Sequence, residues 1–396
     1  MNNSIRLQLS FMMFLEYFIW GAWYVSTNSY MKTNLGSSGQ EIGYAYMALA
    51  IATMISPFFV GMIADRYFSA QKVMGVLHLA GAAMLLLASY TGDTWVFIGI
   101  VLVYSLMYMP TIALSNSIAF SQMADPGKQF PAVRTFGTVG WIIAGLLIGY
   151  LSIEQTHNIF YIAAAASAAL GLFCFTLPDV PPKGKGDLSA SKVLGTEAFV
   201  LFKNRSYLVF FISAVLICIP LSFYYGFANL YLNESGMENA AGKMIYGQLS
   251  EAIFILAIPL LLGRIGVKKM LLIGMAAWVL RYICFAYGDT GANLWMLYAG
   301  IILHGICYDF FFVTGYMYTE ARAGEKIKSA AQGLFTFATY GLGMVIGTWF
   351  SGMVADFYMI NGARQWQSIW MVPVYIAAAV MIYFMLAFRD RDKKHV

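Results

Sequence analysis

Polar and ionisable side chains stand inside long apolar segments of this chain. Asp309 lies in HGICYDFFFVTG (residues 304–315), near the middle of the apolar segment 292–319. A carboxylate at the centre of a membrane-spanning helix costs about 2.5–3.5 kcal/mol even on the mildest insertion scale, and such residues usually face a bundle interior or a water-filled cavity. Asp309 is therefore the first candidate for ligand binding or proton transfer.

Further polar residues within apolar segments share helical faces, because residues three, four or seven positions apart lie on one side of a helix. Asp309 itself is about 100° round the helix from its neighbour Tyr308. Such faces would offer a ligand aromatic surfaces for stacking, acceptor carboxylates and an amide that both donates and accepts. The shared faces are those of Arg134, Thr138 and Trp141 (i, i+4, i+7), Gln248 and Glu251 (i, i+3), and His304 and Tyr308 (i, i+4).

For several ionisable residues a structural role competes with a functional one. Arg134 either contacts a ligand or extends its charge to the aqueous boundary at the end of a span. Glu251 and Arg281 either act on a ligand or form a buried ion pair between two helices. His78 is flanked by leucines, so we expect a histidine satisfied by packing. Glu16 either pairs with a basic residue across the bundle or titrates.

The elements that position these residues are membrane-spanning helices. The chain has 396 residues, of which 60% are hydrophobic and 11% charged, against about 25% charged in soluble domains. Its mean hydropathy is +0.69. A span needs roughly 20 mainly apolar residues, and twelve segments qualify, which predicts an all-α integral membrane protein. The predicted spans are 7–31, 41–64, 71–90, 94–120, 134–152, 157–177, 207–232, 243–263, 268–288, 292–319, 329–355 and 367–388.

A polar segment divides the predicted spans into two sixes. Residues 178–206 are rich in Pro, Gly, Ser and Lys, as linkers are, so we expect six-helix bundles at 1–177 and 207–396. Of the 24 Lys and Arg residues, 20 fall on the side of the two termini and three on the other. Both termini are therefore expected in the cytoplasm. The net charge of +5 thus reports topology, and we expect no nucleic-acid partner.

Motifs for other kinds of chemistry are missing from the sequence. The apolar run at the amino terminus contains Glu16 and is not followed by a cleavage site, so we expect no cleaved signal peptide. The four cysteines stand far apart in apolar spans, without metal-binding spacing. HExxH, GxSxG and Walker A patterns do not occur. We therefore expect neither an enzyme nor a bound metal or organic cofactor.

The two halves of the chain show a weak internal sequence repeat, as many transporters do. PFFVGMIADRYFSAQKVM (57–74) and PLLLGRIGVKKMLLIG (259–274) both place Pro, then Gly, then a basic turn before the next span. GMIADRYFSAQK also resembles the GxxxDRxGRR loop of the major facilitator superfamily, with Gly61, Asp65 and Arg66 in place and Phe68 where that pattern has Gly. This resemblance implies the major facilitator fold of two six-helix halves.

A closer resemblance, to the nucleoside:proton symporter family of that superfamily, runs over residues 5–390. It implies a secondary active transporter that imports nucleosides with protons by alternating access around a mid-membrane site, in the bacterial cytoplasmic (inner) membrane. Because one chain would supply a complete cavity, we expect a monomer. An uncoupled facilitator, or a symporter of another small polar solute such as a sugar, is the alternative. The stretches that carry it are LEYFIWGAWYVSTNSYM (15–31), YMPTIALSNSI (108–118), RTFGTVGW (134–141), SEAIFILAIPLLLGRIGVK (250–268), AAWVLRYICFAYGD (276–289), YDFFFVTG (308–315) and SAAQGLF (329–335).

The resemblance also implies site residues. Arg134 and Thr138 match a polar pair near the ribose, and Trp141 stands where the family has an aromatic residue. Gln248 and Glu251 match a pair that contacts nucleoside, and Tyr308 and Asp309 match an aromatic–aspartate pair. The sequence departs from the family at Ser222 and Tyr225, where amides can read the base, at His304, where a tyrosine is found, and at Glu16, where a glutamine can occur. The proton-coupling candidates are Asp309, Glu251 and Glu16.

Overall fold

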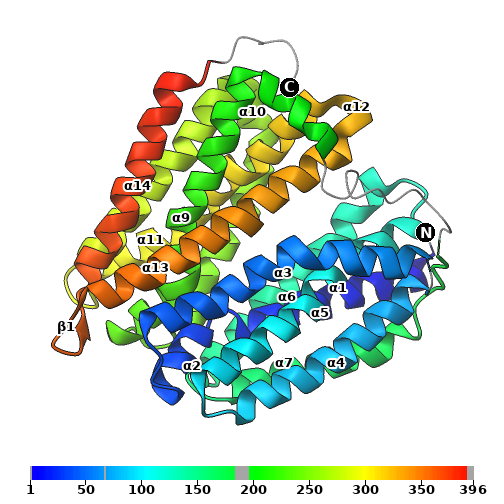
Figure 1. The fold of residues 1–396 in the computed structure, drawn as a ribbon, viewed down its shortest axis with the longest axis horizontal. Helices are drawn as coiled ribbons and strands as arrows, with labels where there is room; N and C mark the ends of the chain where they lie inside the picture. Colours follow the sequence, from blue (N-terminus) through cyan, green and yellow to red (C-terminus); the bar gives the residue numbers. More distant parts are fainter. Residues whose placement is uncertain (1, 67, 183–195, 390–396) are drawn as a thin grey trace. The chain divides into compact units, whose positions relative to one another are not determined.

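The computed structural model describes residues 2–66, 68–182 and 196–389, with the side chains of 56–66, 126, 127, 325, 326 and 329 left out of the description. The chain divides into two compact units, Met1–Asp187 with Asn239–Gly242, and Leu188–Glu238 with Lys243–Val396. Helices make up nearly all of both units (Figure 1). The predicted all-α architecture is confirmed.

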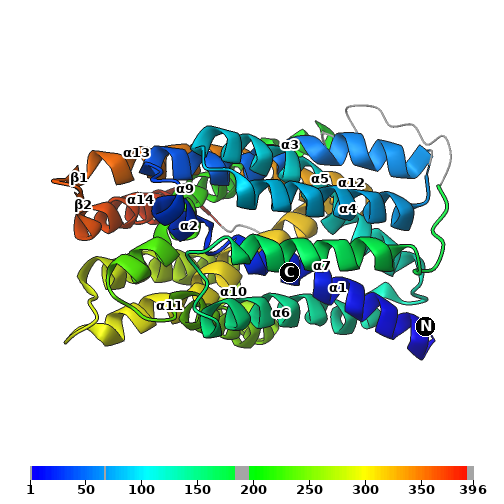
Figure 2. The same ribbon diagram turned by 90° about the horizontal axis from the view of Figure 1, so that it is seen from below.

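In the first unit α1 lies along α6 and α7, and α4 packs between α5 and α7, while α3 packs on α5. Figure 2 shows α1, α6 and α7 side by side. Side-chain oxygens of Asn2 and Asp93 cap the first N–H groups of α1 and α5, which explains where these helices begin. The helices are α1 (Asn3–Trp23), α2 (Thr27–Asn34), α3 (Gly39–Arg66), α4 (Ala70–Tyr90), α5 (Thr94–Ser121), α6 (Pro126–Tyr150) and α7 (Asn158–Cys174).

In the second unit α9 packs against α13 and α14. Gly266 (φ 75°) breaks the helical backbone within α10, and Gly324 (φ 64°) does so within α12. The elements are η1 (Thr196–Lys203), α9 (Arg205–Glu234), α10 (Ala240–Tyr287), α11 (Leu294–Tyr308), η2 (Asp309–Val313), α12 (Thr314–Thr336), η3 (Phe337–Gly343), α13 (Met344–Phe357), α14 (Trp366–Ala387) and the antiparallel pair β1 (Met359–Ile360) and β2 (Ala363–Arg364).

The helix boundaries refine several predicted spans. The first, 7–31, is two helices, α1 and α2, and the tenth, 292–319, contains one π-helical turn, η2, that begins at Asp309. The break at Gly266 separates the eighth and ninth predicted spans within α10. Among the described residues, eight helices are long and apolar enough to cross a membrane.

The predicted linker 178–206 is only partly described. Residues 183–195 lie outside the described residues, whereas Thr196–Lys203 forms the 3-10 helix η1. At the start of this segment, the side-chain amide of Gln71 of α4 donates a hydrogen bond to the carboxylate of Asp179 and accepts one from the N–H of Val180. The side chains of Asp65 and Arg66, on which the superfamily loop motif depends, also lie outside the description.

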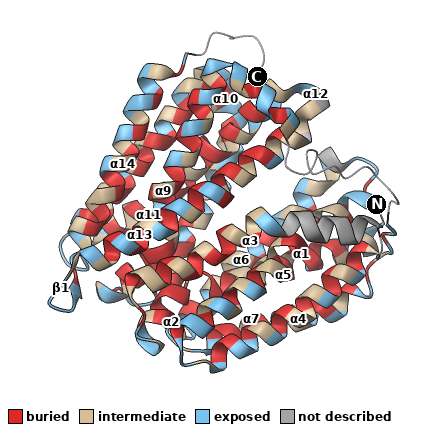
Figure 3. Cartoon of the chain, viewed as in Figure 1, coloured by how far each residue is buried: buried red, intermediate tan, exposed pale blue. Residues whose placement is uncertain are grey.

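Large apolar side chains remain exposed on the outer faces of the helices. Leu256 and Leu386 are 81% and 71% exposed, a surface suited to lipid and unsuited to water. Figure 3 shows how buried and exposed residues share each helix, with the buried ones on the faces turned to neighbouring helices of the same unit. Intramembrane polar residues can therefore be hidden from lipid inside each unit.

Backbone contact between α1 and α6 requires glycine at position 140. A Cβ at Gly140 would overlap the carbonyl oxygen of Phe14, which cannot move without displacing α1. Small residues allow such close helix approach in membranes. This contact fixes the face that α6 turns to α1, and with it the positions of Arg134 and Trp141.

We predict that Gly140→Ala destabilises the purified protein by about 1–3 kcal/mol, because the added methyl overpacks the α1–α6 contact. Thermal unfolding in detergent measures the loss. Gly99→Ala on α5 is the matched control, since among the described residues its added Cβ would meet nothing within 4 Å beyond the backbone of its own helix. An equal effect of both substitutions would show that the close approach of α1 and α6 is unimportant.

Candidate functional site

The polar stripe on α6 faces α1. The guanidinium carbon of Arg134 lies 3.9 Å from the ring centroid of Tyr17, a cation–π contact. The ring of Trp141 meets that of Trp20 edge-on, with centroids 5.4 Å apart. Arg134, Thr138 and Trp141 are half-buried on one face of the helix. Arg134 therefore lies against an aromatic ring of α1, and its predicted contact with a ligand stays a prediction.

In the second unit an aromatic cluster surrounds His304 of α11. Its ring stacks on Tyr224 of α9 at 5.0 Å between centroids and lies 5.5 Å from Tyr308. Tyr225 is 6.4 Å away, edge-on. His304 is buried, while Tyr225 and Tyr308 are half-buried. The fold thus brings together three of the predicted site residues, which come from α9 and α11.

A chain of polar contacts links this cluster to α10. Arg281 Nη1 lies 2.8 Å from His304 Nδ1, and His304 Nε2 lies 3.8 Å from Glu251 Oε2. An arginine can only donate, so Nδ1 accepts and the ring proton of His304 is on Nε2, towards Glu251. His304 therefore bridges the two residues that the sequence suggested as a direct ion pair.

Arg281 is completely buried, and an aromatic face compensates its charge. Its guanidinium carbon lies 3.5 Å from the ring centroid of Tyr224. A desolvated cation–π contact stabilises by about 2 kcal/mol or more. Tyr224 thus contacts both Arg281 and His304 and helps to fix their positions.

The close crossing of α10 and α11 sets the distance between His304 and Glu251. A Cβ at Gly305 would overlap the backbone of Ser250 and Glu251, so only glycine fits there. Ser250 adds a hydrogen bond from its hydroxyl to the carbonyl of Ile302 (2.6 Å). Gln248, one turn before Glu251 on α10, is half-buried.

Several residues near the predicted site were not expected from the sequence. The hydroxyls of Tyr308 and Tyr340 are hydrogen-bonded, which ties α11 to the π-helical η3. Tyr17 and Trp20 cover the α6 stripe, and Tyr224 supports Arg281. Tyrosines are frequent along the whole chain, so no pattern in the sequence distinguishes these from the others.

Ser222 has a different environment from the other predicted site residues. It is fully buried, and its hydroxyl donates to the carbonyl of Ile219 in its own helix (2.6 Å). It lies where α9 crosses α13, because a Cβ at Gly347 would come within 2.6 Å of its oxygen. Its predicted contact with a ligand stays a prediction.

Asp309 is fully buried at the start of η2. Among the described residues, neither of its carboxylate oxygens has a hydrogen-bond partner. A buried polar group without a partner costs about 1–3 kcal/mol, and a charge costs more. Such a cost inside a membrane-spanning segment is typical of a functional residue.

Glu16 and His78 form a buried pair in the first unit. His78 Nε2 lies 2.9 Å from Glu16 Oε2. The expectation that His78 stands alone in apolar packing is wrong, because α1 brings a carboxylate to it from 62 positions away. Of the two roles open to Glu16, pairing with a basic residue across the bundle is observed.

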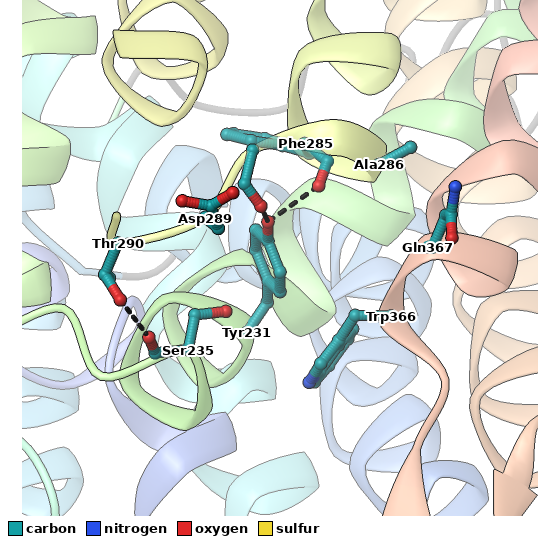
Figure 4. A pocket seen from close by; sticks show the side chains of 9 residues that line it. Tyr231, Ser235, Phe285, Ala286, Asp289, Thr290, Trp366 and Gln367 are labelled. Carbon is teal, nitrogen blue, oxygen red and sulfur yellow. Dashed lines mark hydrogen bonds between the residues drawn. The ribbon is translucent and has the colours of Figure 1, made fainter. Parts of the chain in front are cut away.

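A cavity of about 310 Å³ opens at the ends of α9, α10 and α14 (Figure 4). Tyr231, Asp289 and Trp366 line it, and none of the predicted site residues does. Backbone N–H groups of Asn293 and Gly291 hold the pKa of Asp289, in the loop after α10, below its usual range. Asp289 therefore stays ionised near neutral pH and is unsuited to carrying a proton.

Comparison with known proteins decides the family. The family model described as "Nucleoside H+ symporter" matches residues 1–393. The chain belongs to this family. Its resemblance to nucleoside:proton symporters, predicted from stretches such as RTFGTVGW, is confirmed. Proteins of this kind are transporters, so this symporter is not an enzyme, and a proton as coupling ion requires no cofactor.

Relatives of this symporter share nearly its whole length. The putative nucleoside transporter YegT of Escherichia coli (strain K12) is 42% identical over 402 residues, 98% of this chain and 94% of the relative. Xanthosine permease of the same organism is 36% identical over 404 residues, 98% and 96% of the two chains. The crystal structure of nucleoside transporter NupG matches with a TM-score of 0.90 at 34% identity, covering 99% of this chain and all of that one.

We predict that Asp309→Asn raises the midpoint of thermal unfolding in detergent by a few degrees, because it removes a buried carboxylate that no described residue satisfies. Asp289→Asn is the control. The Asp289 carboxylate accepts from Gly291 N–H (2.7 Å) and Asn293 N–H (3.1 Å), so its replacement should leave stability unchanged or lower. A fall in the midpoint for Asp309→Asn would mean that the carboxylate stabilises the fold.

Proposed function

We propose that this symporter imports nucleosides with protons across the bacterial inner membrane by alternating access. Membership of the nucleoside H+ symporter family over residues 1–393 is the observation that carries the proposal. The polar and aromatic clusters around the half-buried Arg134 and the buried His304 support it, because polar side chains within apolar membrane-spanning helices usually serve a function. The transporter functions as a monomer.

The proposed topology has twelve spans in two bundles, residues 1–177 and 207–396, joined by the cytoplasmic segment 178–206. Eight described helices of spanning length and the backbone break at Gly266 support this count. The excess of basic residues on the side of the termini supports a cytoplasmic location for both ends.

Each unit, taken by itself, contributes candidate nucleoside-binding residues in this proposal. The rings of Trp141 in the first unit and of Tyr225 and Tyr308 in the second are candidates for stacking on the base, since every base offers a π face. Arg134 and Glu251 bond to ribose hydroxyls, one as donor and the other as acceptor. Thr138, Ser222, Gln248, His304 and Asp309 complete the proposed set of binding residues.

His304 acts as a donor in this site. Arg281 occupies its Nδ1, which leaves the Nε2 proton free for Glu251 or for a nucleoside oxygen. A donor is what the tyrosine hydroxyl found here in the family also offers, so the change preserves the hydrogen-bonding role. Buried groups that lose their partner are costly, and this favours solutes with hydroxyls at matching positions.

Proton coupling requires a carboxyl group that changes its protonation as access alternates. Asp309, Glu251 and Glu16 are the candidates, since each lies in an apolar helix. One proton moving inward across 100 mV supplies about 2.3 kcal/mol, which supports roughly 50-fold accumulation of a neutral solute.

We predict that cells lacking their own nucleoside carriers accumulate labelled uridine and adenosine when they express this protein. A protonophore should abolish accumulation, because it removes the proton gradient. Cells with empty vector are the control, and excess unlabelled sugar should not compete. Uptake that resists the protonophore would indicate a facilitator. Absence of nucleoside uptake, with the protein present in the membrane, would contradict the proposal.

We predict that Trp141→Ala raises the KM for nucleoside roughly 5- to 150-fold, because stacking between a base and an aromatic ring is worth about 1–3 kcal/mol. Initial rates of labelled uptake, corrected for protein in the membrane, give the value. Trp295→Ala, which removes a 63% exposed tryptophan of α11, is the control. Equal KM values for Trp141→Ala and the unaltered protein would remove Trp141 from the site.

A further inference from the structure

The Glu16–His78 pair lies in the first unit, among helices α1, α4, α5 and α7. Glu16 is 0% and His78 2% exposed, and their facing atoms Oε2 and Nε2 are 2.9 Å apart. A bare carboxylate in such surroundings is strongly disfavoured. A carboxyl group and an imidazole in contact avoid this by sharing a proton.

The hydrogen bonds of Ser167 show how many protons the pair holds. The Ser167 hydroxyl donates to the carbonyl of His78 (2.8 Å), and its oxygen lies 3.4 Å from His78 Nδ1. A hydroxyl has one proton, so its oxygen accepts from Nδ1–H. With Nδ1 protonated, the contact between Nε2 and Glu16 needs one more proton. The pair is then neutral overall, whichever of the two atoms carries it.

The same surroundings also satisfy the pair after that proton has left. Rotation of the Ser167 hydroxyl towards Nδ1 allows His78 to carry its proton on Nε2 and donate to an ionised Glu16. Thr111 lies 2.7 Å from Glu16 Oε1 and 2.6 Å from the carbonyl of Tyr108, and its single proton can go to either. Both protonation states thus have complete hydrogen bonding, as a site that loads and releases a proton requires.

The pair is connected to the predicted substrate residues through α1. Tyr17, the residue after Glu16, lies under the guanidinium of Arg134. A nucleoside hydroxyl that draws Arg134 away from Tyr17 moves positive charge away from the segment of α1 that carries Glu16 and favours the proton-loaded pair. Coupling of this kind is reciprocal, so a loaded pair also favours nucleoside binding. The other titratable groups around the pair, from described residues of α5 and α7, are Tyr104, Tyr108 and Cys174.

We propose that Glu16 and His78 together form the coupling-proton site of this transporter, apart from the residues that bind nucleoside. This inference rests on the proposed nucleoside–proton symport. It assigns the coupled proton to the first unit, and it leaves Asp309 and Glu251 as nucleoside ligands.

Two assays of labelled uridine transport in proteoliposomes test the assignment. Accumulation driven by an imposed proton gradient needs proton release, whereas counterflow between equal internal and external nucleoside needs none. Glu16→Gln keeps a carbonyl for Thr111 and an amide donor for His78 but cannot ionise. We expect it to keep counterflow within about two-fold of the unaltered protein while its accumulation ratio falls to about one.

His78→Gln is a second variant, read in the same way, in case Glu16→Gln fails to reach the membrane. Glu41→Gln is the control and should leave both assays unchanged, because the Glu41 carboxylate accepts a hydrogen bond from the N–H of Ser38 at the start of α3, away from Glu16 and His78. Undiminished accumulation by Glu16→Gln and His78→Gln would overturn the assignment. So would loss of counterflow in both variants at normal protein levels. Absence of all nucleoside transport in the unaltered protein would instead contradict the proposed function.

Discussion

Charge inside an apolar helix must be compensated by a partner or neutralised by a proton, and this constraint governs the polar interior of both units. Glu16 meets it through His78 at 2.9 Å, and Arg281 meets it through the ring of Tyr224 and the nitrogen of His304. Asp309 has no such partner among the described residues. An uncompensated charge is suited to a ligand that arrives and leaves, whereas a carboxyl group paired with an imidazole can stay hydrogen-bonded whether or not it carries a proton.

Close approach between helices determines where these charged side chains lie. Gly140 lets α6 meet the backbone of α1, which sets Arg134 on Tyr17, and Gly305 lets α11 meet α10, which sets His304 beside Glu251. A proton or nucleoside that alters one of these contacts therefore acts on a whole helix. The positions of Arg134 and His304 depend on these crossings.

The sequence predicts this family and the polar residues inside the helices because both signals are local: apolar length, helical spacing and quoted motifs. The sequence does not predict which helix faces pack against one another. Glu16 and His78 are 62 positions apart, so His78 looked isolated, and His304 separates Arg281 from Glu251. Tyr340 meets Tyr308 through a π-helical turn that no 3.6-residue periodicity indicates. Partners across helices follow from packing, which spacing within one segment does not encode.

The central claim is that a proton crosses the membrane with each nucleoside. Proteoliposomes containing the unaltered protein and an entrapped pH indicator, with no imposed gradient, test it most directly when uridine is added outside. The account predicts that the lumen becomes more acidic as labelled uridine enters, and that neither change occurs in liposomes without the protein. Entry of uridine with a constant internal pH would contradict the account.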